Sequence, residues 1–573
     1  MHKFQGFDRL NYYLALVFAG LIYPLINLLL ALVLKRLIDA GVARNLTALK
    51  QASGVCLLVC IFLALAVFGS ERTKNKFVKH FRQQYRPKVF NQILTSDLQA
   101  FNKHSLGDFL TTMTTTLSTI EEKYLTAYFN VVSNVSLLLF SVLGMLFINW
   151  QLAIAVLIIS LIPLLSMSGL SGKMQAQQKA VLKCQNDYVS KVKDALAGFL
   201  VIKSFNIEKQ LNQEFQSKNN QQAASEFALA ELNNRAISLS NCAGYLVFLV
   251  AYGLGMLMVI HGKTSIGGVT AIVQLVNFVV LPLNKLGLEM NNKKAGLAAM
   301  ATLQQLLDQI HKPLAARQDD LEITQFTANI KFTHVNFAYP QQGNIRQKVL
   351  SNINLQINKG QKYALVGMSG SGKTTLLKLL MRYYQLDTNG SISLDNVNLN
   401  QISLASLYQL INIIQQDVYI FDNSLAYNIT LGKSFTDQEL HEAIKQAGLK
   451  PLVDSNPQGM DLQVGEAGNE LSGGQKQRIS IARALIRKTP ILLMDEATAA
   501  LDQKNTTEIE EAILKIADLT AIVVTHKLNP NLLSKYDAVI FMKDGTITEN
   551  GPFAELMQQK GDLYNLCSLT MNH

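Results

Sequence analysis

The sequence contains few cysteines, and its first half contains long stretches with almost no charge. Only five of its 573 residues are cysteines, at positions 56, 60, 184, 242 and 567. They are scattered, so they suggest no disulfide framework. Apolar residues are concentrated before about residue 290, whereas a soluble protein would spread them along its length. The composition therefore indicates a membrane protein that carries a soluble part.

Six apolar runs could each cross a hydrocarbon core of about 30 Å. They cover residues 12–34, 54–68, 131–148, 152–167, 242–260 and 266–283. The second run is the weakest, because it needs its flanking residues to reach a full span. Some runs could instead be buried helices of a large α-domain, but so many runs almost free of charge favour six membrane crossings.

The connections between these runs orient the chain. Residues 72–123 and 173–235 are rich in Lys and Arg, while the short connections 149–151 and 261–265 carry only Lys263 between them. The positive-inside rule then places the long connections and both termini in the cytoplasm, with the basic first outer loop as an exception. The net charge of +11 follows from this orientation, so nucleic-acid binding is not implied. The first 11 residues are too polar for a signal peptide.

Both long connections mix apolar and basic residues at helical spacing, which predicts helices that extend the membrane spans.

The first motif of the soluble part lies at residues 367–374, which read Gly-Met-Ser-Gly-Ser-Gly-Lys-Thr. This is the P-loop pattern, in which backbone N–H groups surround phosphates, Lys373 meets the β and γ oxygens, and the Thr374 hydroxyl can bind Mg²⁺. An apolar strand before it and a helix after it disfavour an accidental glycine-rich turn. The candidate nucleotide-binding residues here are Gly367, Ser369, Gly370, Ser371, Gly372, Lys373, Thr374 and Thr375.

Two further patterns follow the P-loop. Residues 471–475 read Leu-Ser-Gly-Gly-Gln and open a helix, which makes a second anion cradle from backbone N–H groups. Residues 491–494 are apolar and lead into Asp495 and Glu496, as a buried strand that delivers two carboxylates at its carboxyl end would. Asp495 would hold Mg²⁺, and Glu496 would polarise the attacking water.

With these three patterns the chain resembles an ATP-binding cassette (ABC) transporter of the exporter type over essentially its whole length. The resemblance implies an α-helical membrane domain with six transmembrane helices and an α/β P-loop NTPase cassette. We expect the membrane domain at residues 1–310, a linker at 311–327 and the cassette at 328–573.

The resemblance also implies roles for residues outside the P-loop. Residues Ser472, Gly473, Gly474 and Gln475 would close over the nucleotide of an opposite subunit. Gln416 would contact Mg²⁺ and His526 the γ-phosphate, Asp502 would belong to the D-loop, and Tyr339 would stack on adenine. A half-buried strand tyrosine is the alternative for Tyr339. Ala499 and Ala467 depart from the usual family residues, while Glu466 keeps a contact expected with the membrane domain.

The implied function is export of an amphipathic or hydrophobic substrate, such as a drug, lipid or peptide, driven by hydrolysis of ATP with Mg²⁺. Each ATP site needs a second signature, so the chain should dimerise with itself or with another half-transporter. Alternatives are an importer of siderophores or vitamins with the same fold, and an ATP-gated regulatory or channel-like membrane protein. An intact Glu496 argues against the gate. The bacterial plasma membrane is the expected location, with the cassette in the cytoplasm.

Cargo contacts and coupling contacts are the least determined. The polar and aromatic residues of the spans are Asn27, Tyr252, Gln274, Asn277 and Phe278. They could line a cargo cavity, or they could hydrogen-bond between helices. The resemblance places short coupling helices at the tips of the long connections, around Ser105-Leu-Gly107 and at residues 198–205.

Overall fold

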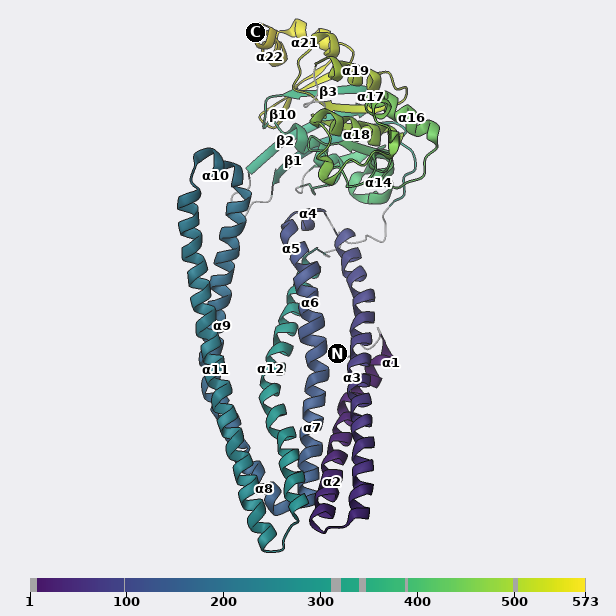
Figure 1. The fold of residues 1–573 in the computed structure, drawn as a ribbon. Coiled ribbons are helices and arrows are strands. Elements are labelled where there is room, and N and C mark those ends of the chain that lie inside the picture. Colours follow the sequence, from purple (N-terminus) through teal and green to yellow (C-terminus); the bar gives the residue numbers. More distant parts are fainter. Residues whose placement is uncertain are drawn as a thin grey trace. The chain divides into compact units, whose positions relative to one another are not determined.

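The computed structural model describes residues 8–96, 98–310, 321–339, 347–386, 390–497 and 503–571. The chain divides into two compact units (Figure 1), one of residues 1–96 with 100–311 and one of residues 312–573 with 97–99. Each unit is described by itself.

Helices form the first unit. Its elements are α1 (Arg9–Val17), the π-helical turn η2 (Phe18–Ile22), α2 (Tyr23–Val42), α3 (Leu46–Leu94), α4 (Leu98–Phe101), α5 (Leu106–Thr111), η3 (Thr112–Thr116), α6 (Leu117–Thr119), η4 (Ile120–Leu125), α7 (Thr126–Ile148), α8 (Trp150–Ile159), α9 (Leu161–Ala197), α10 (Phe199–Phe205), α11 (Glu208–Ile260) and α12 (Ile266–Ile310).

Among the described residues, five stretches of helix are long and apolar enough to cross a membrane: Arg9–Val42, Leu46–Leu94, Leu106–Ile148, Glu208–Ile260 and Ile266–Ile310. The weak second run gains its full span because α3 already begins at Leu46. The fourth run, 152–167, is divided between α8 and α9 at Ser160, whose hydroxyl donates to the Val156 carbonyl. Six helical segments therefore cover the six predicted runs.

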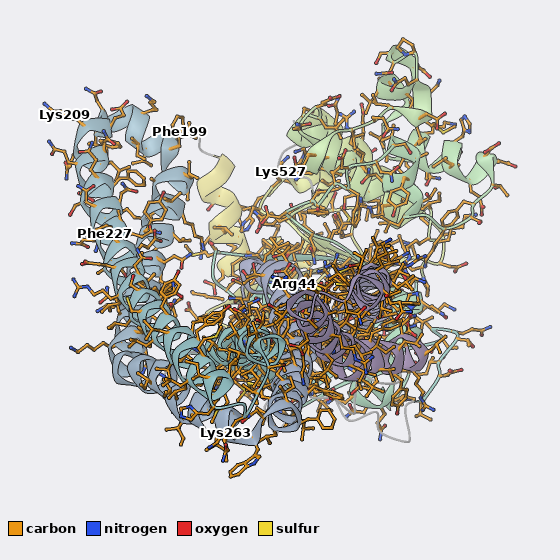
Figure 2. All side chains as sticks on the ribbon, turned by 60° about the horizontal axis from the view of Figure 1, so that its bottom comes forward. Arg44, Phe199, Lys209, Phe227, Lys263 and Lys527 are labelled. Atoms are coloured by element: carbon orange, nitrogen blue, oxygen red, sulfur yellow. The ribbon has the colours of Figure 1, made fainter. Side chains whose placement is uncertain are left out.

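The prediction that both long connections are helical is confirmed. α3 continues to Leu94, while α9 and α11 lie side by side and are joined by α10 (Figure 1). We call residues 173–235 the tip hairpin. None of the residues of α10 is buried, and the buried residues of α11 begin only at Ala236. Phe199 and Lys209 lie at the end of this hairpin and Phe227 lies along its arm (Figure 2). The tip hairpin is thus packed mainly against itself within the membrane unit.

The first long connection holds a buried ion-pair cluster. The Glu121 carboxylate is fully buried and accepts from Arg82 Nε at 2.9 Å and from Arg86 Nε at 2.8 Å. Arg86 Nη2 also donates to Ser118 Oγ at 3.3 Å. The cluster fastens the turns between α5 and α7 to the extension of α3.

At the other end of the unit, α12 begins against α2. The Gly267 N–H donates to Asp39 Oδ1 at 2.9 Å, and the Ser265 hydroxyl donates to Asp39 Oδ2 at 2.9 Å. A Cβ on Gly267 would lie 2.3 Å from the Lys35 carbonyl oxygen. Only glycine allows this approach of the two backbones, and Asp39 satisfies the free N–H of the new helix.

The second unit contains two sheets and the helices around them. Its elements are β1 (Asn329–Tyr339), β2 (Gln347–Asn358), β3 (Lys362–Gly367), α13 (Lys373–Leu380), β4 (Ser391–Leu394), β5 (Val397–Asn398), η5 (Leu399–Gln401), α14 (Leu404–Leu410), β6 (Ile411–Ile414), α15 (Leu425–Thr430), α16 (Asp437–Gln446), α17 (Lys450–Ser455), η6 (Gly459–Asp461), η7 (Glu466–Gly468), α18 (Gly473–Leu485), β7 (Ile491–Asp495), α19 (Gln503–Leu514), β8 (Thr520–Val524), α20 (Pro530–Leu533), β9 (Ala538–Lys543), β10 (Thr546–Gly551), α21 (Phe553–Gln559) and α22 (Asp562–Met571).

The larger sheet has the strand order β10-β9-β3-β8-β7-β6, and the smaller antiparallel sheet has the order β2-β1-β4-β5. Strands β6, β7, β8, β3 and β9 run parallel to one another, and β10 pairs antiparallel with β9 at the edge. Every residue of β7 and β8 is buried, as expected of strands covered on both faces. The carboxyl ends of these strands meet at one edge, where open α/β sheets bind their ligands.

The sequence predicted a linker at residues 311–327. Residues 311–320 lie outside the described part of the chain, but residues 321–327 are packed on the second unit. The Leu321 N–H donates to the Gln401 carbonyl at 2.7 Å, the Ile323 N–H donates to Ser406 Oγ at 3.1 Å, and Phe326 is buried in the core. Burial of apolar Ile323 and Phe326 explains why this segment belongs with the cassette.

Candidate nucleotide-binding site

The P-loop joins β3 to α13 in a conformation that requires glycine. Gly370 and Gly372 have φ of 81° and 100°, values that favour residues without a Cβ. A Cβ on Gly372 would also lie 2.5 Å from Leu350 Cδ2, and one on Gly367 would lie 2.2 Å from the Met542 carbonyl oxygen. The strand, loop and helix predicted from the sequence are therefore confirmed.

Lys373 lies at the centre of this loop. Its side chain is buried, and Nζ donates to the carbonyls of Gly367 and Met368, each at 2.9 Å, with Ser371 Oγ at 3.5 Å. Burial lowers the pKa of the Lys373 amino group, while the Glu496 and Asp495 carboxylates favour its charged form. An anion that entered the loop would replace these carbonyl contacts with a charge-assisted bond.

The first carboxylate after β7 reaches the P-loop helix. Thr374 Oγ1 donates to Asp495 Oδ1 at 2.8 Å. Burial raises the pKa of Asp495 above its ordinary value, and the bond from Thr374 opposes that shift. A hydroxyl and a buried carboxylate in contact are oxygen ligands of the kind that Mg²⁺ prefers.

The second carboxylate is held from two sides. Glu496 Oε2 accepts from Gln416 Nε2 at 3.2 Å, and Glu496 Oε1 lies 2.6 Å from His526 Nε2. Glu496 has a φ of 51°, which is uncommon for a residue with a side chain and is typical of functional sites. The ends of β6, β7 and β8 thus bring together three residues that the sequence analysis assigned to one site.

Tyr339 has contacts on several sides. Its hydroxyl is 3.0 Å from Thr375 Oγ1, and its ring packs edge to face on Phe337 and Tyr384, at centroid distances of 5.0 and 5.1 Å. This is the environment of a half-buried strand tyrosine, the alternative considered above. Stacking on adenine stays a prediction.

The signature residues form a helix start of their own. Ser472 caps α18 in a capping box: its hydroxyl accepts from the Gln475 N–H at 3.2 Å, and Gln475 Oε1 accepts from the Ser472 N–H at 2.8 Å. Ser472 and Gly473 are exposed, and within the described residues no hydrogen bond links them to the P-loop. Asp502 and Ala499 lie outside the described residues.

The sequence analysis missed the residues that tie α18 to its surroundings. Lys476 Nζ donates to the Ala467 carbonyl at 2.9 Å, in a turn where Ala467 has a φ of 51°. Arg483 Nε donates to the Asn428 carbonyl at 2.8 Å and Nη1 to the Tyr419 carbonyl at 3.2 Å. The bonds of Arg483 connect positions 55 and 64 residues apart, so no local pattern could reveal them.

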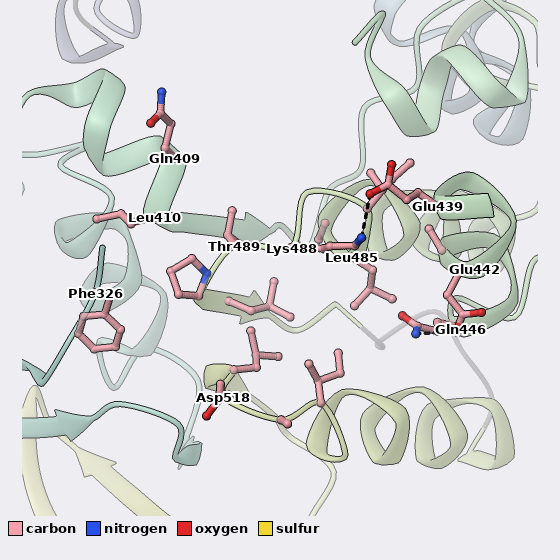
Figure 3. A pocket seen from close by; sticks show the side chains of 18 of the residues that line it. Phe326, Gln409, Leu410, Glu439, Glu442, Gln446, Leu485, Lys488, Thr489 and Asp518 are labelled. Carbon is pink, nitrogen blue, oxygen red and sulfur yellow. Dashed lines mark hydrogen bonds and ion pairs between the residues drawn. The ribbon is translucent and has the colours of Figure 1, made fainter. Parts of the chain in front are cut away.

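A hollow of about 1130 Å³ lies elsewhere in the cassette (Figure 3). Leu410, Pro490 and Leu519 line it, and they immediately precede β6, β7 and β8. It therefore lies at the amino ends of the strands, opposite the edge that holds Asp495 and Glu496. The Glu439–Lys488 ion pair of 2.8 Å is on its wall.

Comparison with known proteins supports this reading along the whole chain. Residues 10–283 match the ABC transporter transmembrane region, and residues 350–499 match the ABC transporter family. An uncharacterized ABC transporter ATP-binding protein of Bacillus subtilis (strain 168) is 31% identical over 423 residues, covering 74% of this chain and 72% of that protein. A putative multidrug export ATP-binding/permease protein of Staphylococcus aureus (strain NCTC 8325 / PS 47) is 29% identical over 569 residues, covering 97% and 96%.

The fold is also that of a solved structure. A bacterial Atm1-family ABC exporter with ATP bound covers 98% of this chain, and this chain covers 99% of it, with a TM-score of 0.84 at 21% identity. A membrane region and an ATP-binding cassette thus occur in one chain with the P-loop, signature and carboxylate pair in the expected order. The chain belongs to the ABC transporter family, as an exporter-type, ATP-hydrolysing member of it.

Proposed function

We propose that this protein exports an amphipathic or hydrophobic substrate across the plasma membrane by alternating access in a dimer, driven by ATP hydrolysis. The observation that carries the proposal is the position of Glu496. Its carboxylate lies between Gln416 and His526, beside the P-loop, as a general base for water should. A sensor that only bound ATP would need the P-loop but not this base.

The P-loop residues of the chain would hold the triphosphate. The glycines leave room for the backbone N–H groups to surround phosphate oxygens, and the buried Lys373 ammonium would neutralise charge on the β and γ groups. Thr374 and Asp495 fit a bound Mg²⁺ through their oxygen atoms, and Gln416, which donates to the neighbouring Glu496, would approach the same ion. That ion supplies charge neutralisation on the phosphates during transfer.

Water activation would then fall to Glu496 and His526. Glu496 accepts the proton of the attacking water, and the Gln416 amide orients the carboxylate. His526 lies within hydrogen-bonding distance of Glu496. With ATP bound, its side chain would exchange this partner for the γ-phosphate. The three side chains come from three strand ends, so the sheet fixes their mutual positions.

Dimerisation would complete the site. The exposed Ser472 and Gly473 at the start of α18 offer a hydroxyl, N–H groups and the positive end of a helix. Such a surface suits the γ-phosphate of a nucleotide on a second cassette. The chain carries every motif of one site, so a homodimer would be self-sufficient, and a heterodimer with another half-transporter uses the same surfaces.

Coupling would use the tip hairpin. Phe199, Leu200 and Phe205 on α10 are 54%, 83% and 73% exposed. On the cassette, Tyr419 and Phe421 follow Gln416, are 66% and 44% exposed, and contact each other edge to face. Both surfaces are apolar and adaptable, which suits docking of the hairpin tip on a cassette of the dimer, with the long connections and cassette in the cytoplasm.

The base assignment is tested by Glu496→Gln. The variant should bind ATP with normal affinity but hydrolyse it about 10² to 10⁴ times more slowly, because a positioned base is lost. Steady-state ATPase of the full chain in lipid nanodiscs, with nucleotide binding measured in parallel, gives both quantities. Glu508→Gln, at an exposed acid on α19, is the matched control. Turnover of Glu496→Gln within a few-fold of the wild type would refute the role.

A further inference from the structure

The membrane unit contains a polar cavity of about 330 Å³. It lies among α2, α3, α7 and α12, and its lining residues are Tyr23, Val67, Ser70, Glu71, Asn130, Ser133, Asn134, Leu137, Phe278, Leu281, Pro282, Lys285 and Glu289. Its charged residues lie just beyond the apolar runs, where α3 and α12 leave them. The cavity is therefore built by one protomer, at the end of the spans that leads to the long connections.

The five span residues considered from the sequence contribute little to it. Phe278 lines the cavity, but Tyr252 on α11 is exposed and does not. Asn27 is buried, and its amide donates to the Tyr23 carbonyl of its own helix at 2.8 Å. The charged groups beyond the runs matter more than the polar groups within them.

The two acids of the cavity already have donors. Glu71 Oε1 accepts from Lys74 Nζ at 2.7 Å, and Lys74 is buried. Glu289 Oε1 accepts from Asn130 Nδ2 at 2.9 Å. The Lys74 ammonium neutralises Glu71, so Glu71 adds little net charge to the cavity.

Lys285 differs from these acids. It forms neither a hydrogen bond nor an ion pair with any residue in the described ranges, although it lines the same space. Within the described residues, the hydroxyls of Tyr23, Ser70 and Ser133 and the amide of Asn134 also form no side-chain hydrogen bond, so the cavity presents a cation and several free donors. Next to them, Leu137, Phe278 and Leu281 give it an apolar wall.

A free ammonium that shares one cavity with neutral donors and apolar side chains is complementary to an amphiphile with an anionic head. Lys285 is exposed in the single chain, so its attraction for an anion depends on how far a bound amphiphile excludes water from the cavity. Resting on the proposed export function, we propose that this cavity binds the anionic head group of an amphipathic cargo, with Lys285 as its ionic partner. Each protomer of a dimer would carry one such site.

Glu289 distinguishes an ionic role of Lys285 from a structural one. It lies one helical turn from Lys285 on α12, so its charge opposes an anion bound there. Replacing Lys285 by a neutral residue should therefore weaken the binding of an anionic cargo. Removing the charge of Glu289 should leave that binding unchanged or strengthen it. A purely structural role for the pair would make both changes harmful.

The test uses three amphiphiles with the same alkyl chain: decyl phosphate, decyltrimethylammonium and decanol. The wild-type protein in phosphatidylcholine nanodiscs should show ATPase stimulation and direct binding at the lowest concentration with decyl phosphate. Lys285→Gln should raise the half-maximal concentration of decyl phosphate by about tenfold or more, the loss expected for a charge-assisted bond. Its responses to the other two probes should stay within about twofold. Lys294→Gln, at an exposed lysine of α12 outside the cavity, should change none of them.

A second arm separates a bilayer lipid from a dissolved amphiphile. If the anionic head belongs to a lipid, replacing part of the phosphatidylcholine by phosphatidylglycerol should raise ATPase activity without any added probe, and Lys285→Gln should abolish that rise. If neither decyl phosphate nor phosphatidylglycerol acts through Lys285, the inference is wrong. Failure of the proposed export function would look different. In that case the wild-type protein itself would show no ATPase activity without a probe, and it would resemble Glu496→Gln.

Discussion

At the scale of single residues, the Glu121 cluster shows how the membrane unit tolerates a buried carboxylate. A carboxylate without water is costly unless charged donors surround it. Arg82 and Arg86 supply such donors from α3, and Ser118 orients Arg86. The cluster fixes the path of the chain between α5 and α7.

Glu121→Gln should therefore destabilise the protein. An amide cannot accept from two guanidinium groups as a carboxylate does, and breaking a buried pair costs about 3 to 5 kcal/mol. The expected result is a clearly lower unfolding temperature for the purified full chain in detergent. Glu122→Gln changes the exposed neighbour and should melt like the wild type. Equal melting of the two variants would contradict a structural role for the cluster.

Sequence reasoning identified residues of one kind at this scale and missed residues of another. Lys373, Thr374 and Glu496 belong to short contiguous patterns, so the backbone chemistry of loop and strand end could be predicted from neighbours alone. Glu121 and its partner Arg86 are 35 positions apart. Their contact depends on how two helices pack, and no local signal carries it.

At the scale of elements, the tip hairpin is a long pair of helices that makes few contacts with the rest of its unit. Its helices were predictable from apolar residues at helical spacing, and the short α10 from the resemblance to exporter-type transporters, which places a short helix at residues 198–205. The division at Ser160 was not, because residues 152–167 look like one uninterrupted run. The packing of residues 321–327 was also hidden, since a proline and a charged stretch before them suggested a linker.

Phe205→Ala tests whether α10 couples the cassette to the membrane unit. If α10 docks through its apolar side chains, the variant should keep most of its basal ATP hydrolysis but lose cargo-stimulated ATPase and transport in vesicles. Phe227→Ala is a matched control, because Phe227 is 70% exposed on the arm of the same hairpin, away from the tip. Wild-type transport by Phe205→Ala would exclude this contact and favour the first connection, where Ser105 caps α5.

At the scale of the whole molecule, the proposed ATP sites would each need two chains, because no hydrogen bond links Ser472 or Gly473 to the P-loop within the described residues. Ser472→Arg should spare nucleotide binding while abolishing hydrolysis, because the bulky cation fills a cradle used by the partner. Lys373→Ala should also abolish hydrolysis, because it removes the P-loop lysine that would hold the phosphates in the other half of the site. Mixed dimers of the two variants would keep one site free of both changes.

Co-expression of the two variants with different affinity tags, followed by tandem purification, isolates the mixed dimers. Their ATPase should exceed that of either variant purified alone and reach about half the wild-type value if the sites act independently. Mixed dimers as inactive as both parents would contradict independent sites shared between chains.

The exposed tip also has a consequence before any transport begins. In the single chain, Leu200 and Phe205 are exposed on a helix with none of its residues buried, and a newly made subunit would present them in the same way. Exposed apolar side chains on a poorly supported element are what chaperones and proteases recognise. If α10 docks on a cassette as proposed, an unassembled subunit would carry its own degradation signal, and assembly would hide it. The same side chains that would transmit force in the finished transporter would act, in the unassembled chain, as a quality-control mark that keeps the number of subunits matched.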